Sequence, residues 1–292
     1  MPEAHSPLWN DIAKLPPRAS ETSRYLLVNQ AAFASALEPL KKLGAFERCA
    51  LLGQSKSACQ DGATPFVLQA DGMFGQAPNS RAIQQLCDAG CYACAISVLD
   101  SPLKLDAIAA ALTARCDVEL PDRHSMLLRY FDTRIMEPLL GALDPSQLVD
   151  FLSCTTNWYY ANRDGRLEYV YSRDPTGVDT FVPPLRLSAA QQATLIEAGE
   201  VDSIIDLLLR NKVGRLLDIT FSERYAAISQ CVESARSWGL TATSDLAAFC
   251  TLSLHSGFDF FEQTPWKELL SRVKRGEISF SEAMDVASKA GK

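Results

Sequence analysis

Short apolar runs alternate with helix-like periodicity along the first 172 residues. Strands are predicted where aromatic and β-branched residues cluster, and helices where apolar residues recur every three or four positions. Alternating strands and helices are typical of a layered α/β domain, so we expect a mixed sheet with flanking helices over residues 23–172. The predicted strands are Arg24–Asn29, Thr64–Gln69, Cys91–Leu99, Met126–Phe131, Trp158–Ala161 and Leu167–Tyr171. The predicted helices are Ala31–Leu43, Ser80–Ala89, Pro102–Ala114 and Arg134–Leu143.

Capping and turn residues mark several boundaries of these elements. Ser101 before Pro102 is typical of an N-cap followed by proline at the first helical position. Asp144, followed three residues later by Gln147, predicts a capping box and another helix. The sequence Asn162–Gly165 is typical of a tight turn, so the strands on either side of it are expected to form a hairpin.

The pattern changes after residue 172. Prolines predict a stiff linker over residues 173–187, and the pattern from Ser188 onward is helical throughout. We therefore expect an all-α C-terminal lobe over residues 188–292. Residues 1–22 are rich in proline and are expected to form a loosely held N-terminal arm.

The charge pattern bears on which partners the protein can have. The formal charge is −7 at pH 7, and the densest basic stretch, Lys267–Arg275, is interrupted by Glu268 and by apolar residues. Nucleic-acid binding is therefore not expected, because it requires clustered cations. Neither a run long enough to cross a membrane nor an apolar signal segment is present, so we expect a cytoplasmic protein without stable membrane insertion. Nine cysteines fit reduced thiols in that compartment.

The cysteines Cys87, Cys91 and Cys94 have the C-x3-C-x2-C spacing of an iron–sulfur cluster loop. They straddle a predicted helix end, a glycine and a strand, so they do not share one open loop. Tyr92 also follows the second cysteine instead of preceding the third. A cysteine-ligated metalloenzyme is therefore kept as an alternative hypothesis, and buried structural thiols are the favoured interpretation.

Other catalytic patterns are missing from the sequence. His5, His124 and His255 are not spaced with a second ligand as a helical zinc motif requires. A serine nucleophile in a G-x-S-x-G turn is also lacking. We therefore expect no catalytic residue, no metal and no cofactor, and we interpret the chain as a binding protein and not as an enzyme.

The segment around residue 130 combines aromatic and charged side chains. Alternation along the predicted strand places Arg129 and Phe131 on one face, and Tyr130 and Asp132 on the other. Asp132 is positioned to cap the helix that includes Arg134. We expect these charges to be paired and to hold the strand end to the helix start, so that Arg129→Ala destabilises the fold.

With these residues, the chain resembles the effector adaptor/chaperone proteins of bacterial type VI secretion systems over most of residues 23–275. The resemblance rests on LLRYFDTRIMEPLL (127–140), on the passage from Asp144 to Trp158, and on TPFVLQ (64–69). In the helical lobe, residues 237–261 and the helix that begins PWKELL (265–270) are similar to the same family. Thr133 stands where a proline is common in the family.

The resemblance implies a protein that binds the N-terminal region of a cognate toxin effector and helps load it onto the spike-tip protein. In that interpretation Arg129, Tyr130, Asp132, Arg134 and Trp158 form a structural motif. A protein-interaction module unrelated to secretion remains open as a further alternative. Aromatic residues of the helical lobe are the candidate partner-binding residues: Trp238, Phe258, Phe260, Phe261 and Trp266.

Overall fold

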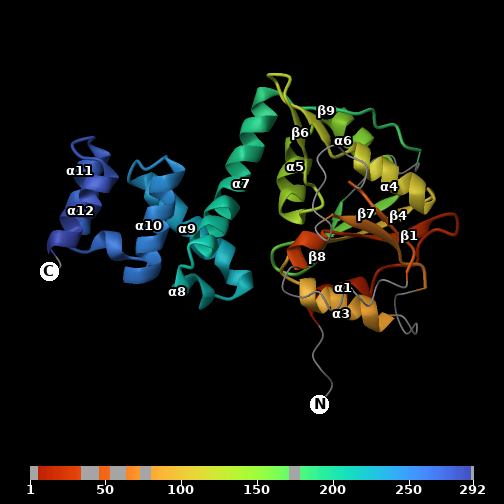
Figure 1. Cartoon of the computed structure of the whole chain (residues 1–292), viewed down its shortest axis with the longest axis horizontal. Helices are drawn as coiled ribbons and strands as arrows, with labels where there is room; N and C mark the ends of the chain where they lie inside the picture. The colour runs from red at the N-terminus through yellow and green to blue at the C-terminus, as the bar shows by residue number, and fades with distance from the viewer. Residues whose placement is uncertain (1–5, 34–45, 53–63, 73–79, 171–177, 291–292) are drawn as a thin grey trace, which may run out of the picture. The chain divides into compact units, whose positions relative to one another are not determined.

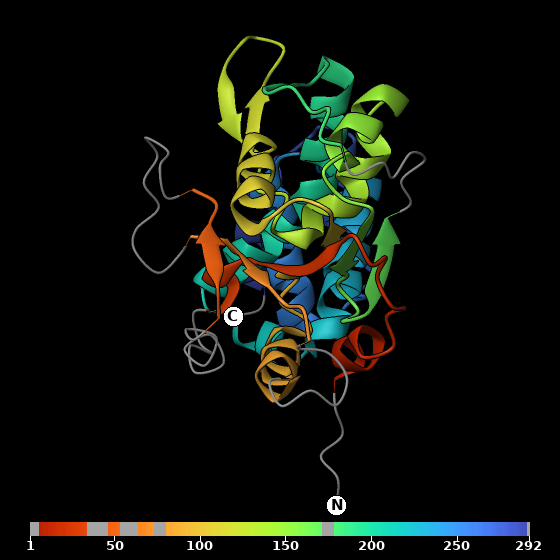
Figure 2. The same ribbon diagram turned by 90° about the vertical axis from the view of Figure 1, so that its right-hand side faces the viewer.

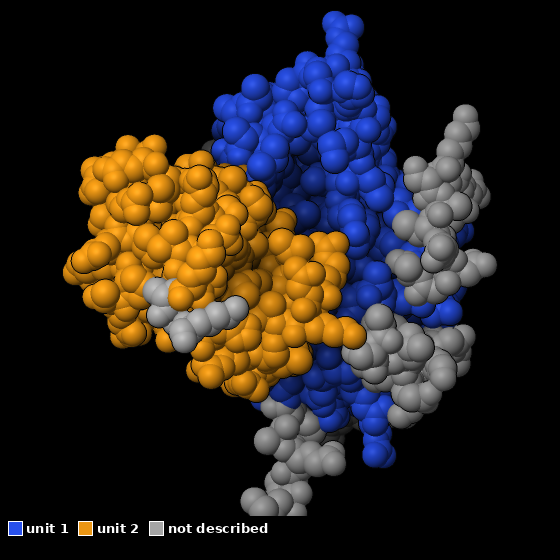
Figure 3. Space-filling model, turned by 60° about the vertical axis from the view of Figure 1, so that its left-hand side comes forward, with its two compact units in different colours: residues 1–196 blue, residues 197–292 orange. Residues whose placement is uncertain are grey.

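The structure, a computed structural model, describes residues 6–33, 46–52, 64–72, 80–170 and 178–290. The chain divides into two compact units, residues 1–196 and residues 197–292, coloured separately in Figure 3. Unit 1 contains sheets with flanking helices, and unit 2 is helical (Figure 1). The predicted fold class, an α/β lobe followed by an all-α lobe, is confirmed.

A six-stranded antiparallel sheet forms the centre of unit 1. Its strand order is β2-β3-β1-β4-β7-β8. β4 lies between β1 and β7 because its apolar residues are buried on both faces. The Asn162–Gly165 turn joins β7 to β8 in the predicted hairpin, with Gly165 at φ 68°. The bounds are β1 Ser23–Val28, β2 Arg48–Ala50, β3 Phe66–Gln69, β4 Ile96–Ser101, β7 Asn157–Ala161 and β8 Leu167–Val170.

Helices cover both faces of this sheet, as Figure 2 shows. Alternate residues of β1 enter different cores: Tyr25 and Leu27 join the cluster with α4, α5 and α6, and Leu26 and Val28 join the cluster with α1 and α3. This follows from the two-residue period of a strand. Unit 1 therefore has a helix–sheet–helix layering. The helices are α1 Pro7–Ile12, α3 Ser80–Gly90, α4 Leu105–Ala114, α5 Met136–Ala142 and α6 Pro145–Leu152.

The N-terminal segment is not a loosely held arm from residue 6 onward, and that prediction is wrong. Ser6 caps α1, and Leu8, Trp9 and Ile12 are buried against the sheet. The Arg24 guanidinium also donates to the carbonyl oxygen of Pro16 at 3.0 Å. The prediction gave too much weight to the proline content. Proline at the first position of a helix is favourable, and the apolar residues of this short helix are spaced so that they pack against the sheet.

Two predicted boundaries between residues 90 and 105 are also wrong. Gly90 is still helical, and Cys94 adopts φ 48°, so the strand begins at Ile96 and not at Cys91. Ser101 ends the strand, and its hydroxyl donates to the carbonyl oxygen of Cys154 at 2.6 Å and does not cap a helix. The helix predicted over Ala31–Leu43 lies largely outside the described residues, which include only the 3₁₀ turn η1 (Gln30–Phe33).

A second, three-stranded sheet has the order β6-β5-β9. Its strands are β5 Asp117–Glu119, β6 Ser125–Leu127 and β9 Leu185–Arg186. β5 pairs antiparallel with β6 and parallel with β9, so β6 is an edge strand. The strand predicted over Met126–Phe131 ends at Leu127, because the chain turns at Tyr130 and Phe131, which are both buried.

The predicted linker, residues 173–187, is attached to unit 1 over its described part. β9 is a strand of the small sheet, and Asp179 is paired with Arg115. A capping box formed by Ser188 and Gln191 then starts α7 (Ala189–Arg210), at the position where the helical pattern was predicted to begin. The boundary between the units falls at residue 196, within this helix.

Unit 2 is a bundle around one apolar core. Its elements after α7 are α8 Gly214–Leu217, α9 Phe221–Ser237, α10 Thr243–Ser256, the 3₁₀ turn η4 Phe260–Glu262, α11 Trp266–Lys274 and α12 Phe280–Ala290. α10 contributes Leu246, Phe249 and Cys250 to the core. Among the described residues, none of the helices combines the length and apolar character needed to cross a membrane.

Candidate functional site

The segment from Arg129 to Arg134 serves the core of unit 1 through two of its residues. Tyr130 is fully buried, its hydroxyl donates to the carbonyl oxygen of Leu112 at 2.7 Å, and its ring lies edge-on to Phe151 and Trp158. Burial raises the pKa of the Tyr130 phenol well above its usual value. Tyr130 and Trp158 therefore have the structural role predicted for them.

The charges of the same segment are paired differently from the prediction. Asp132 caps the 3₁₀ turn η3 (Thr133–Ile135) as expected, and its carboxylate accepts two bonds from the Arg134 guanidinium, at 2.9 and 2.6 Å. Arg129 is exposed, and its guanidinium lies over the Phe131 ring at 5.7 Å from the centroid. The expectation that Arg129 belongs to a buried, paired set of charges is therefore wrong, because the chain turns at residue 130 and does not continue as a strand.

Replacing Asp132 with alanine should lower the free energy of unfolding by about 1–2 kcal/mol, since the turn loses its cap and the ion pair with Arg134 is removed. Arg129→Ala should change it by less than about 0.5 kcal/mol, because that side chain is exposed. Urea unfolding of the two variants measures the difference. Equal destabilisation by both would contradict the assignment of the ion pair to Arg134.

A buried arginine in unit 1 holds in place the segment around Asp179, which the sequence predicted as part of a linker. Arg115 is completely buried at the end of α4, where its guanidinium donates to the carbonyl oxygens of Ala111, Phe151 and Asp150 at 2.7, 2.7 and 3.1 Å. It also donates to the carboxylate of Asp179 at 2.6 Å. Arg115 therefore joins two helices and the segment that leads into β9.

The electrostatics of this contact favour the charged forms of both partners. Burial alone would raise the pKa of the Asp179 carboxyl, but the hydrogen bond from Arg115 lowers it, and the net direction is down. Burial opposes ionisation of Arg115 as well, but its partners raise the pKa of the guanidinium. The Arg115 guanidinium also lies over the ring of Phe181, 4.8 Å from its centroid. The Arg115–Asp179 ion pair therefore fixes the path of residues 179–186.

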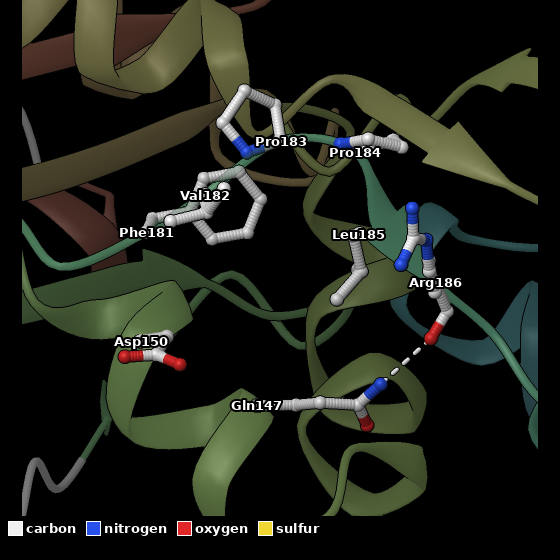
Figure 4. Close-up of a pocket in the computed structure, with 8 residues that line it drawn as sticks. All are labelled: Gln147, Asp150, Phe181, Val182, Pro183, Pro184, Leu185 and Arg186. Atoms are coloured by element: carbon white, nitrogen blue, oxygen red, sulfur yellow. Dashed lines mark hydrogen bonds between the residues drawn. The ribbon is translucent and has the colours of Figure 1, made fainter.

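Residues 181–186 form one wall of a recess of about 320 Å³, the proline recess, drawn in Figure 4. Gln147 and Asp150 of α6 line the other side. The Gln147 amide nitrogen donates to the carbonyl oxygen of Arg186 at 2.7 Å, and Asp150 accepts a bond from the Thr180 hydroxyl at 2.6 Å. The charged side chains among its lining residues are Asp150 and Arg186.

An apolar groove of about 240 Å³ lies beside the small sheet, between the β5–β6 hairpin and the first turns of α7. Three of its residues are strongly exposed: Met126 at 56%, Leu127 at 40% and Ile196 at 66%. Exposed apolar side chains gathered at one groove are characteristic of binding surfaces. The residues that line the apolar groove are Val118, Leu120, Met126, Leu127, Leu128, Leu187, Gln192, Leu195 and Ile196.

The aromatic residues singled out in the helical lobe belong mostly to its core. Phe260 is 1% exposed, and its ring lies 5.2 Å from Trp266 and 5.8 Å from Phe261. Phe261, Trp266 and Trp238 are half-buried and pack against the same cluster. Phe258 differs from the other four, being 46% exposed. The structure therefore assigns Phe260 to the core, and Phe258 is the most exposed of these five aromatic side chains.

The cysteines of the alternative hypothesis are buried side chains. Cys87 and Cys91 lie in the core between the large sheet and its helices α1 and α3, and burial raises the pKa of both thiols. This works against the thiolate form that binds iron. Within the described ranges, no group of three or more His, Cys, Asp or Glu side chains is placed to hold a metal ion. The metalloenzyme alternative therefore gains no support here.

Sequence reasoning missed the groove and the buried ion pairs. Besides Arg115–Asp179, Arg24 and Asp100 face each other on β1 and β4, with bonds of 2.7 and 2.9 Å and little exposure of either side chain. A charged residue within an otherwise apolar strand was the available signal, because such a residue needs a partner when buried. Met126 and Leu127 were predicted as the start of a strand, and that prediction did not indicate that their side chains are exposed.

Comparison with known proteins identifies one region of the chain. Residues 24–150 match the family model described as a domain of unknown function (DUF4123). The match runs from β1 into α6 and includes the hairpin β5–β6 and the Arg129–Arg134 segment. No curated protein and no solved structure matches the chain.

Proposed function

We propose that the protein is an adaptor/chaperone that binds the N-terminal region of a type VI secretion effector in the cytoplasm and helps load it onto the spike-tip protein. The family match supports this proposal because it includes the Arg129–Arg134 segment, on which the resemblance to such adaptors chiefly rests. The proposal assigns the protein no catalytic role, because a carrier needs only surfaces that hold a client.

The apolar groove is the observation that carries a binding function. Met126, Leu127 and Ile196 expose large apolar side chains around a single hollow of unit 1. Apolar surface left in water costs about 25 cal/mol per Å², and covering it with a partner recovers that energy. A binding protein has a reason to keep such a surface, since burial of apolar anchors provides much of the affinity of an interface.

Deleting the gene in a type VI-competent cell tests the proposed function. We expect the cognate toxin to be lost from the secreted fraction while secretion of the spike-tip protein continues, and toxin secretion should be restored by the wild-type gene. Normal toxin delivery by the deletion strain would contradict the proposal and favour an interaction module unrelated to secretion.

A further inference from the structure

We propose that the free edge of β6 accepts a short extended segment of a partner as an added strand, and that this segment carries alternating apolar residues between acidic ends. The added strand places its apolar side chains over the apolar groove. The identification of this segment as part of the effector rests on the proposed function. The binding of a strand to β6 is independent of that function.

The backbone of β6 presents unpaired hydrogen-bonding groups outward. Val118 pairs with Met126, and bonds from the Leu120 amide to His124 and from the Leu128 amide to Cys116 continue the same ladder. In an antiparallel ladder, alternate residues turn their N–H and C=O groups away from the partner strand. Those of Ser125 and Leu127 therefore face outward, and neither amide has a protein partner in the described part of the chain.

The side chains of β6 do not protect this edge from pairing with another strand. Edge strands are commonly protected by lysine, proline or an inward-facing charge. β6 has Met126 and Leu127 instead, both well exposed. The ladder is short, extending only from His124 to Leu128, which limits the segment it can bind. Ile196 extends the apolar surface to α7.

The charges at the two ends of β6 indicate the chemistry of the segment. Arg123 precedes the strand and Arg129 follows it, and both are exposed. No ion pair involves either guanidinium among the described residues, in a chain of net charge −7. Arg123 lies in the turn before the strand, at φ 65°, and the five ladder residues 124–128 between the two arginines span about 17 Å. A segment of roughly that length with a carboxylate near each end would complement both.

The same charges argue against a second copy of this chain as the occupant. Two β6 strands paired antiparallel around Met126 would place Arg123 of each copy opposite Arg129 of the other. Like charges directly opposite across a strand pair are destabilising. The segment therefore belongs to a different chain, one whose strand carries acidic residues.

Fluorescence anisotropy with a labelled synthetic peptide tests the inference on the full-length protein. The probe alternates valine and threonine between two glutamates at each end, and the comparison peptide has lysines in their place. We expect the glutamate-ended peptide to bind the wild type and Ser125→Ala equally, and Ser125→Pro at least ten-fold more weakly. Proline removes only the outward N–H at this position, whereas Ser125→Ala keeps it, and the ladder to β5 stays complete in both.

A second variant keeps the test decisive if Ser125→Pro unfolds. Arg123→Glu combined with Arg129→Glu changes two exposed side chains and should reverse the preference, so that the lysine-ended peptide binds better. Absence of binding by the glutamate-ended peptide, or unchanged preference in this variant, would overturn the inference. So would a stable dimer of the wild type, seen by light scattering, that Ser125→Pro dissociates.

A separate experiment identifies the protein that supplies the added strand. Toxin co-purification with Ser125→Ala but not with Ser125→Pro would identify the toxin as the chain that supplies the segment. If Ser125→Pro loses the peptide but still binds the toxin, β6 is a strand-binding site and the toxin binds at another surface. A wild type that binds peptide but never toxin would count against the proposed function alone.

Discussion

Replacing Arg115 with alanine should lower the free energy of unfolding of unit 1 by on the order of 3–5 kcal/mol. The guanidinium is fully buried, and its loss leaves the carbonyl oxygens of α4 and α6 without their donor and Asp179 without its ion-pair partner. Such a loss exceeds that of an ordinary surface ion pair several-fold. Urea unfolding followed by circular dichroism measures the change. The segment 179–186 should also become more sensitive to proteases.

A matched control and a pH series make this prediction specific. Arg186 is also paired, with Glu119 at 3.3 Å, but its side chain is 75% exposed, so Arg186→Ala should cost less than about 1 kcal/mol. Because the folded pKa of Asp179 lies below its usual 3.8, the stability it contributes is complete above that value and is lost as the pH falls through the lower, folded value. The penalty of Arg115→Ala should therefore shrink in acid. If Arg115→Ala lowers the free energy of unfolding by less than about 1 kcal/mol at neutral pH, the Arg115–Asp179 pair does not have the structural role assigned to it.

Replacing Phe260 with alanine should destabilise unit 2 by about 3–5 kcal/mol, because the ring is 1% exposed and fills the space between Phe249 and Trp266. Phe258→Ala provides the matched control two residues away. Its ring is 46% exposed, so the variant should unfold within about 0.5 kcal/mol of the wild type. Thermal melts of the two proteins separate the roles.

The pair of phenylalanine variants also decides what the helical unit contributes to binding. If Phe258→Ala keeps full stability and loses the partner, the exposed ring is an interface anchor. A Phe260→Ala variant as stable as the wild type would contradict the core assignment.

Local signals in the sequence predicted local structure well. The capping box at Asp144, the helix start at Ser188 and the turn at Gly165 depend on residues within a few positions of one another, and each forms as expected. The α/β and all-α division followed from hydrophobic periodicity, which reports which face of an element is buried. Asp132 as a cap is a contact of the same short range.

Contacts between distant residues could not be predicted in the same way. Arg115 and Asp179 are 64 positions apart, and nothing near either residue specifies the other. The expectation that Arg129 is buried and paired failed because it assumed a continuous strand. The chain turns at residue 130, which leaves Arg129 exposed, and Asp132 pairs with Arg134. The candidate edge of β6 depends on pairing with β5, which was not predicted, since three-residue strands carry too weak a periodic signal.

Co-purification from a type VI-competent cell tests the adaptor function most directly. The tagged protein, expressed at its native level, should enrich one toxin and the spike-tip protein over an untagged control, and the tagged toxin should enrich this protein in return. Quantitative mass spectrometry of both eluates measures the enrichment. Recovery of both partners in the two directions is the predicted result, and eluates containing neither the toxin nor the spike-tip protein above the control would contradict the account.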